Sequence, residues 1–202
     1  MPIIIVAGFG RCGSSLVMQM LEAGGQAVTG DWPAFELSSS FDLSLEWLLS
    51  HDDHAVKVLD PHEYPLPRGP QYKTIWLDRN LKHQANSLAK FLNATMGQAF
   101  TKGHLKRIMR AYIKDRPKAM AVLRNIGSKV LSLQFEDLIT KPRWAAERIA
   151  AFVGGLNIEP MVNVVLPRGV QCQPDMQIEM SLMESRHAKH TGVLNERRNH
   201  KI

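Results

Sequence analysis

The sequence lacks long hydrophobic runs and has few cysteines, and both absences narrow its class. No apolar run among the 202 residues approaches the ~20 residues that a helix needs to span a bilayer. Met1 and Pro2 lead directly into an apolar segment, without the basic region and cleavage site of a signal peptide. Two cysteines, Cys12 and Cys172, are too few for a disulfide framework, and no Cys/His spacing is typical of zinc. We therefore expect a cytoplasmic protein without a membrane span or a metal site.

Acidic residues are also fewer than basic ones. The chain has 25 Lys and Arg against 19 Asp and Glu, which gives a formal net charge of +6 and a pI near 9.5. The basic residues are most concentrated between Lys102 and Lys118, in a helical pattern. Such a stripe is either the solvated face of a helix or a surface that attracts an anionic ligand. No aromatic-rich strand or basic recognition motif accompanies it, so we expect no nucleic-acid partner.

Short apolar runs alternate with helical patterns along the chain. Strands are predicted at residues 3–7, 55–59, 74–77 and 129–135. Helices are predicted at residues 14–23, 41–49 with Ser40 as the cap, 81–92, 103–125 with a break or kink near Pro117, and 142–153. This order predicts an α/β fold of the three-layer P-loop type, with a short parallel sheet flanked by helices. We expect one domain over residues 1–202, with its core at about 3–155; the pattern weakens over 156–202, where residues 176–187 have a helical pattern.

The first predicted strand runs into a glycine-rich loop that fits two motifs. Gly8-Phe9-Gly10-Arg11-Cys12-Gly13 spells the dinucleotide fingerprint G-x-G-x-x-G. Continued to Ser15, the same residues spell the phosphate loop G-x-x-x-x-G-K-[ST], with Ser14 in the place of the lysine. A buried strand, a glycine turn and a helix N-terminus together form a site for an anion, because the first N–H groups of the helix face the loop.

Two of the enzymes that use such loops fit the sequence poorly. An NAD(P)-dependent dehydrogenase is favoured by Asp31, which follows an apparent second strand where a ribose-binding acid belongs. However, residues 32–50 do not continue that half-domain, and the chain leaves little room for a substrate domain. A kinase or NTPase is excluded more directly, because the phosphate-binding lysine is missing and no Walker-B acid is evident.

A third enzyme class accounts for a basic residue early in the loop, at Arg11, in place of the lysine expected after Gly13. Arg11 precedes a small residue, a glycine and two serines, and this segment resembles the 5′-phosphosulfate loop of sulfotransferases that use 3′-phosphoadenylyl sulfate (PAPS). That family typically holds the 3′-phosphate with an Arg at a strand end and a Ser eight residues later, which matches Arg79 and Ser87. Residues 130–155 resemble a structural segment found late in many members. The resemblance thus covers roughly residues 3–155, with three separate motifs in the right order.

The resemblance implies a site and a reaction without a metal. The PAPS-binding residues it implies are Gly10, Arg11, Cys12, Gly13, Ser14, Ser15, Arg79 and Ser87. Arg11 would neutralise charge on the leaving phosphate and on the transferring sulfonate, and adenosine 3′,5′-bisphosphate (PAP) would be released. Cys12, next to Arg11 at a helix N-terminus, has either a lowered thiol pKa or simply the small side chain that the loop needs.

The general base is less evident, because the family's strand motif Lys-x-His is incomplete. Lys57 is present, but no histidine follows it in register. The candidates, in order of preference, are Asp31, Asp60, Glu36 and His62.

The acceptor stays open. A small alcohol or amine, a carbohydrate and a protein tyrosine all fit, and the basic stripe at Lys102–Lys118 mildly favours an anionic one. The chain is short for the family, so the acceptor pocket is either open or completed by a partner subunit in a homo-oligomer. A sulfotransferase-like domain that binds the nucleotide without catalysis is a further alternative.

Overall fold

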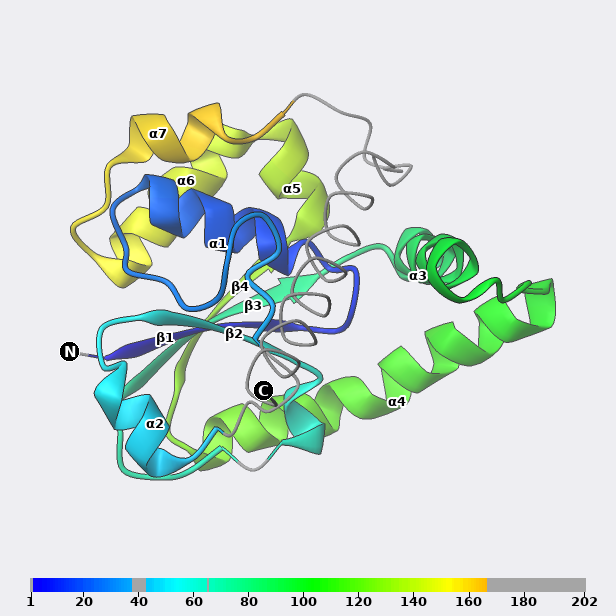
Figure 1. Cartoon of the computed structure of the whole chain (residues 1–202), viewed down its shortest axis with the longest axis horizontal. Helices are drawn as coiled ribbons and strands as arrows, with labels where there is room; N and C mark the ends of the chain where they lie inside the picture. Colours follow the sequence, from blue (N-terminus) through cyan, green and yellow to red (C-terminus); the bar gives the residue numbers. More distant parts are fainter. Residues whose placement is uncertain (1, 38–42, 65, 167–202) are drawn as a thin grey trace, which may run out of the picture.

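A four-stranded parallel sheet forms the centre of the molecule (Figure 1). The computed structural model describes residues 2–37, 43–64 and 66–166. The strand order is β2 (Ala55–Leu59), β1 (Ile3–Gly8), β3 (Tyr72–Asp78) and β4 (Lys129–Gln134). This architecture confirms the predicted α/β fold with a short parallel sheet flanked by helices.

The register of the strands brings their carboxyl ends to one edge. Gly8 at the end of β1 pairs with Leu59 on β2 and with Leu77 on β3, and Asp78 pairs with Gln134 on β4. The segments that follow these strands therefore start side by side. In open α/β sheets, ligands bind at this edge.

Helices cover both faces of the sheet (Figure 1). One face carries α1 (Ser14–Ala23), α5 (Phe135–Thr140), α6 (Pro142–Val153) and α7 (Ile158–Asn163). The other face carries α2 (Leu45–Ser50), the short 3-10 helix η1 (Pro61–Glu63) and the C-terminal half of α4 (Lys102–Asn125). Between them, α3 (Leu81–Met96) and the N-terminal half of α4 extend beyond the carboxyl edge of the sheet.

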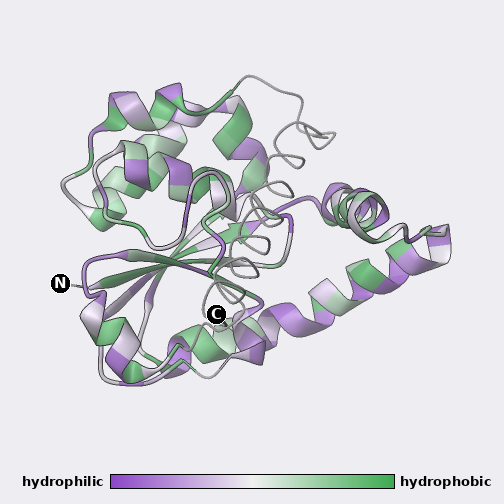
Figure 2. Ribbon diagram, viewed as in Figure 1, coloured by the Kyte–Doolittle hydropathy of each residue, from purple (hydrophilic) through white to green (hydrophobic). Residues whose placement is uncertain are grey.

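The alternation of side chains along β1 explains why the core has two halves. Ile4 and Val6 belong to the cluster under α1 and α6, whereas Ile3 and Ile5 belong to the cluster under α4. Because successive strand residues point to opposite faces, a strand that is apolar throughout is buried on both sides. Figure 2 shows the result, with hydrophobic strands inside and hydrophilic bands on the outer helix surfaces. Met161 on α7 is also buried, so the packed core continues past residue 155.

The structure corrects several of the predicted elements. The helix predicted at residues 41–49 begins at Leu45, because the side chain of Ser44 accepts a hydrogen bond from the backbone N–H of Trp47. Ser40 lies outside the described residues, as does the helical pattern at 176–187. Of the break or kink predicted near Pro117, the break is absent, since α4 is one continuous helix from Lys102 to Asn125 with Pro117 inside it.

No helix in the described ranges is both long enough and apolar enough to cross a membrane.

Candidate functional site

The loop between β1 and α1 is shaped by two residues in left-handed backbone conformations. Arg11 has a φ of 68° and Gly13 a φ of 98°. The first hydrogen bond of the helix runs from the N–H of Val17 to the carbonyl of Gly13, at 3.2 Å. Gly13 caps the helix without a side chain, so the N–H groups of the first turn face the loop and form a place for an anion.

Close packing requires glycine at Gly13. A Cβ there would lie 2.4 Å from Cδ2 of Phe135, the first residue of α5. At Gly8 a Cβ would lie 2.7 Å from Sγ of Cys12 and from the carbonyl oxygen of Leu77. These glycines of the motif therefore let the loop fold tightly against the ends of β3 and β4.

Cys12 is an internal packing residue of this loop. Its side chain is fully buried, and burial raises the pKa of the thiol to about 11. Of the two interpretations of Cys12, the small side chain fits this environment and the lowered thiol pKa does not.

The structure brings together the residues predicted to bind the two ends of the nucleotide. Nε of Arg11 donates a hydrogen bond to Oγ of Ser87 at 3.2 Å. Nη1 of Arg79 donates to the backbone carbonyl of Arg11 at 2.9 Å, and both Arg79 and Ser87 are buried. The loop and the start of α3 thus form one cationic site, although 76 residues separate Arg11 from Ser87.

Aromatic rings hold the two guanidinium groups in place. Cζ of Arg79 lies 4.2 Å from the ring centroid of Phe135, and Cζ of Arg11 lies 5.0 Å from that of Phe91. Stacking on a ring restrains the orientation of a guanidinium group, whose planar fork of N–H donors matches carboxylate and phosphate groups.

Lys57 supports the loop from β2. Its ammonium group is buried and donates to Oγ of Ser15 at 3.1 Å, to the carbonyl of Ala34 at 2.9 Å and to Glu36 at 2.7 Å. Because the Ser15 oxygen accepts this bond, its own O–H is left to donate to an anion in the loop. In the sequence, Lys57 was identified only as part of the incomplete Lys-x-His motif, and its contacts with the loop were not predicted.

The backbone of the loop is held from the other side by two residues that sequence reasoning missed. Nε2 of Gln84 on α3 donates to the carbonyls of Phe9 and Gly10, at 3.1 and 3.0 Å. The hydroxyl of Tyr112 on α4 donates to the same Gly10 carbonyl at 3.4 Å, and its ring stacks on Phe9 at 5.1 Å. Neither contact has a local sequence signal, because the partners are backbone carbonyls of a loop 74 to 102 residues away.

The four candidate bases lie at different places. Asp60 directly follows β2, and its backbone N–H donates to the carbonyl of Gly8 at 3.0 Å. Burial, followed by the nearby charge of Glu63, raises the pKa of Asp60 above its ordinary value. His62 stands edge-on to Phe9, with ring centroids 5.9 Å apart, and its Nε2 lies 3.9 Å from Asp115.

The other two candidates lie on the segment after α1. Glu36 is paired with Lys57 and so lies next to Ser15 through that ammonium group. Asp31 is exposed and precedes the turn in which the N–H of Phe35 donates to the Asp31 carbonyl. The structure therefore brings Asp60, His62 and Glu36 to the loop region, whereas Asp31 is exposed on the segment after α1.

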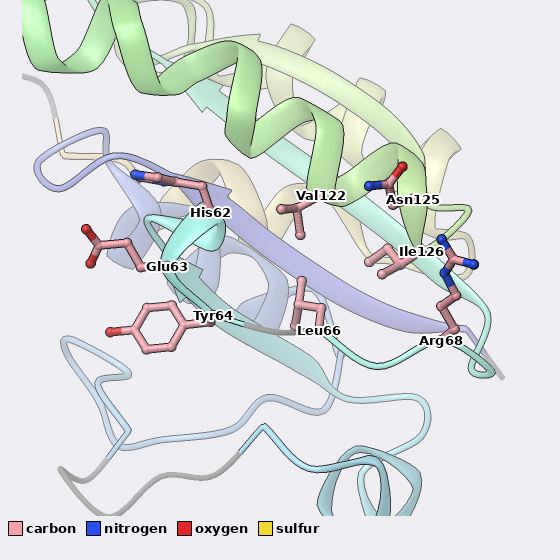
Figure 3. A pocket seen from close by; sticks show the side chains of 8 residues that line it. All are labelled: His62, Glu63, Tyr64, Leu66, Arg68, Val122, Asn125 and Ile126. Carbon is pink, nitrogen blue, oxygen red and sulfur yellow. The ribbon is translucent and has the colours of Figure 1, made fainter.

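A pocket of about 420 Å³ opens beside His62 (Figure 3). One wall is the segment after β2, and the other is the C-terminal end of α4. The lining residues are His62, Glu63, Tyr64, Leu66, Arg68, Val122, Asn125 and Ile126. Because His62 also contacts Phe9, this pocket adjoins the loop.

No group of three or more His, Cys, Asp or Glu side chains in the described parts of the chain is placed to hold a metal ion.

Comparison with known proteins identifies the fold and nothing finer. No family profile matches the chain, and no curated protein is detectably similar in sequence. The chain is similar in structure to mouse sulfotransferase SULT7A1, whose crystal structure is a complex with PAP, with a TM-score of 0.57 and 16% sequence identity. The match covers 81% of this chain and 63% of the mouse protein, so this chain spans less than two thirds of that protein's length. The fold is therefore sulfotransferase-like.

Proposed function

We propose that this protein is a sulfotransferase that moves a sulfuryl group from PAPS to a hydroxyl or amine acceptor and releases PAP. The observation that carries the proposal is the connection of Arg11, Ser87 and Arg79 in one buried site. A loop with helix N–H groups alone would suit any phosphate. A second buried arginine and a serine beside that loop suit a ligand with phosphates on both the 5′ and 3′ sides of a ribose.

Each residue has a defined part in the proposed mechanism. The N–H groups of the α1 N-terminus and the hydroxyls of Ser14 and Ser15 bind the 5′-phosphate. Arg79 and Ser87 bind the 3′-phosphate, and Arg11 stabilises the charge that develops as the sulfur–oxygen bond to that 5′-phosphate breaks. PAPS supplies the activated sulfuryl group.

The geometry favours Asp60 as the base that takes the acceptor proton. It directly follows β2 beside Gly8, and its raised pKa is that of a carboxylate with increased basicity. His62, two residues later, lines the pocket that we propose for part of the acceptor. Asp31, Glu36 and His62 are the other candidates.

The sheet topology argues against the dehydrogenase. In a dinucleotide-binding fold the strand after the first helix pairs with the first strand. Here β2, which begins at Ala55, takes that position, and the segment after α1 makes a single bridge from Val28 to Ala55 on the far side of β2. Asp31 therefore does not lie at the end of a strand next to β1.

The test is a calorimetric titration of the purified protein with PAP, NAD⁺ and NADP⁺ without added metal. We expect micromolar binding of PAP and none of the dinucleotides. Arg79→Ala should abolish PAP binding, whereas Arg148→Ala, a control at an exposed arginine on α6, should bind as the wild type does. Binding of NAD(P) without PAP would overturn the proposal. Binding of PAP without sulfuryl transfer to any acceptor would favour the non-catalytic domain.

A further inference from the structure

The excess of positive charge is concentrated in one segment of the chain, residues 79–114. Residues 79–114 contain eight Lys and Arg and no Asp or Glu. The formal charge of this segment is therefore +8, more than the net charge of +6 of the whole chain. The rest of the protein is therefore slightly acidic. This segment forms α3 and the N-terminal half of α4, the arm that extends beyond the carboxyl edge of the sheet (Figure 1).

Apart from Arg79, the basic side chains of this arm are exposed. They are Lys82, Lys90, Lys102, Lys106, Arg107, Arg110 and Lys114. None of these seven forms an ion pair with another described residue, whereas Arg116 and Lys118, which follow on α4, are paired with Asp78 and Asp115. The charge of the arm is thus not neutralised by its neighbours in the described part of the fold.

Four of these cations form a row along α4. Lys102, Lys106, Arg110 and Lys114 are spaced four residues apart, so successive charges rise ~6 Å and the row extends ~18 Å along the helix. Tyr112, which contacts Gly10, lies on a different side of the helix from Lys114. The row therefore faces solvent beside the site, where it can hold a distant part of a long ligand while another part reaches the loop.

We propose that this arm binds a linear anionic polysaccharide, carboxylated or already sulfated, as the acceptor; this inference rests on the proposed sulfotransferase function. An extended polyanion meets a row of cations at several points, and it is drawn to the surface by the local field. Each sugar also offers hydroxyl groups. In the transfer, the acceptor O–H bond breaks and an O–S bond forms, the S–O bond to the 5′-phosphate breaks with its electron pair leaving on PAP, and the proton goes to the base.

The composition of the arm favours a polysaccharide over other polyanions. Binding of single-stranded nucleic acid relies on exposed aromatic rings. In the arm, Phe91 lies against Arg11, Tyr112 lies against Phe9, and the half-buried Phe100 stands edge-on to His104. Protein–protein interfaces are usually centred on a cluster of buried anchor residues. The exposed large apolar residues of the arm, Leu81, Met96 and Ile113, are separated along the two helices.

The test is direct binding, measured without turnover. The probes are a fluorescently labelled polyuronate oligosaccharide and a neutral glucan of the same length, at low and at physiological salt. We expect the polyuronate to bind at least tenfold more tightly than the glucan, with an affinity that falls as salt rises. A variant with Lys102→Gln, Lys106→Gln, Arg110→Gln and Lys114→Gln should bind polyuronate at least tenfold more weakly.

A control variant with the same net charge separates the arm from the charge of the whole protein. It carries Arg124→Gln, Lys129→Gln, Lys141→Gln and Arg148→Gln, all at exposed positions outside the arm. We expect its polyuronate affinity to stay within twofold of the wild type. Equal losses in both variants, or no loss in the arm variant, would overturn the inference. Tighter binding of polyglutamate or oligothymidylate than of polyuronate would overturn it in favour of a protein or a nucleic acid.

PAP titration of the arm variant keeps the two proposals distinguishable. Unchanged PAP affinity with lost polyuronate binding supports both. If the wild type binds PAP but not polyuronate, the proposed role of the arm is refuted and the proposed sulfotransferase function is not. If the wild type does not bind PAP, the proposed sulfotransferase function is refuted.

Discussion

At the scale of single residues, Cys12 shows how burial decides the chemistry of a loop. With a thiol pKa of about 11, only ~0.1% of the side chain is thiolate at pH 8. In a Cys172→Ser background, we expect iodoacetamide to label Cys12 of the native protein at least a hundredfold more slowly than that of the urea-unfolded protein. Mass spectrometry measures both rates. Equal rates would mean that the loop opens readily or that the thiol is not buried.

Gly13 tests the steric argument for the loop. Gly13→Ala places a methyl group against Phe135 and keeps an L-residue at a φ of 98°, so we expect a loss of ~2–4 kcal/mol in the free energy of unfolding. Gly10→Ala is the matched control, because nothing lies within 4 Å of a Cβ there. Urea denaturation measures both variants. Similar losses at the two positions would contradict the packing described for Phe135.

Asp60 combines a cost in stability with its proposed role as the base. A carboxyl whose folded pKa is raised destabilises the fold as the pH rises from its unfolded pKa of ~4 through the folded one. Asp60→Asn removes this cost, and asparagine tolerates the left-handed φ of 51°. We expect the melting temperature of Asp60→Asn at pH 7 to rise by about 2 °C, and the difference to vanish below about pH 4.

The same variant separates stability from catalysis. Asp60→Asn should bind PAP as the wild type does and lose sulfuryl transfer at least a hundredfold, because it cannot take the acceptor proton. Full activity in Asp60→Asn would move the role of the base to another candidate.

At the scale of elements, α4 is tied to the sheet by Arg116, which donates two hydrogen bonds to Asp78 at the end of β3. Burial alone would raise the pKa of Asp78, but the hydrogen bonds from Arg116 and Trp76 outweigh it and hold that pKa below its ordinary value. A carboxyl whose folded pKa is lowered stabilises the fold at pH values above its unfolded pKa of ~4. This contribution is lost as the pH falls through the folded pKa.

Arg116→Gln therefore has a pH-dependent effect on stability. Because the arginine is nearly half-exposed, we expect a loss of only ~0.5–1 kcal/mol at pH 7. The loss should shrink as the pH falls through the lowered folded pKa of Asp78, because the protonated carboxyl no longer pairs with Arg116. Lys118→Gln, which removes an exposed pair within α4, is the control and should change stability less. A pH-independent loss in Arg116→Gln would contradict the ion pair.

Elements with strong local signals were predicted well from the sequence. The bounds of α1, β2 and α6 agree with the prediction, since an apolar run or a helical stripe ends at Gly or Pro in each case. The start of α2 was predicted wrongly, because the N–H of Trp47 donates to Ser44, so that Ser44 and not Ser40 caps the helix. Of the break or kink predicted near Pro117, the break was wrong; the C-terminal half of α4, which includes Pro117, packs on the sheet through Ala119 and Leu123.

The site was predictable only in part, for a related reason. Arg11, Arg79 and Ser87 were predicted as site residues because the resemblance specifies their types and spacing, and the structure places them in contact. The sequence could not indicate that Gln84 and Lys57 hold the loop, because their partners are backbone carbonyls and residues that are 23 to 75 positions away. Such contacts exist only after the parallel register has aligned the strand ends.

At the scale of the whole molecule, the chain divides into a slightly acidic body and a basic arm beside the site. With polyuronate as the acceptor, the arm variant should raise KM at least tenfold and leave kcat within twofold of the wild type, because the row binds a part of the acceptor that does not react. Steady-state kinetics at fixed PAPS measures this. A fall in kcat with unchanged KM would mean that the arm acts on the transfer step itself.

The central claim is that Arg11, Arg79 and Ser87 form one site for two phosphates. Comparing the affinities for PAP and for adenosine 5′-monophosphate tests it most directly, since the two ligands differ only in the 3′-phosphate. We predict that the wild type prefers PAP by at least a hundredfold, and that Arg79→Ala and Ser87→Ala each reduce this preference. Equal affinity of the wild type for both nucleotides would contradict the claim.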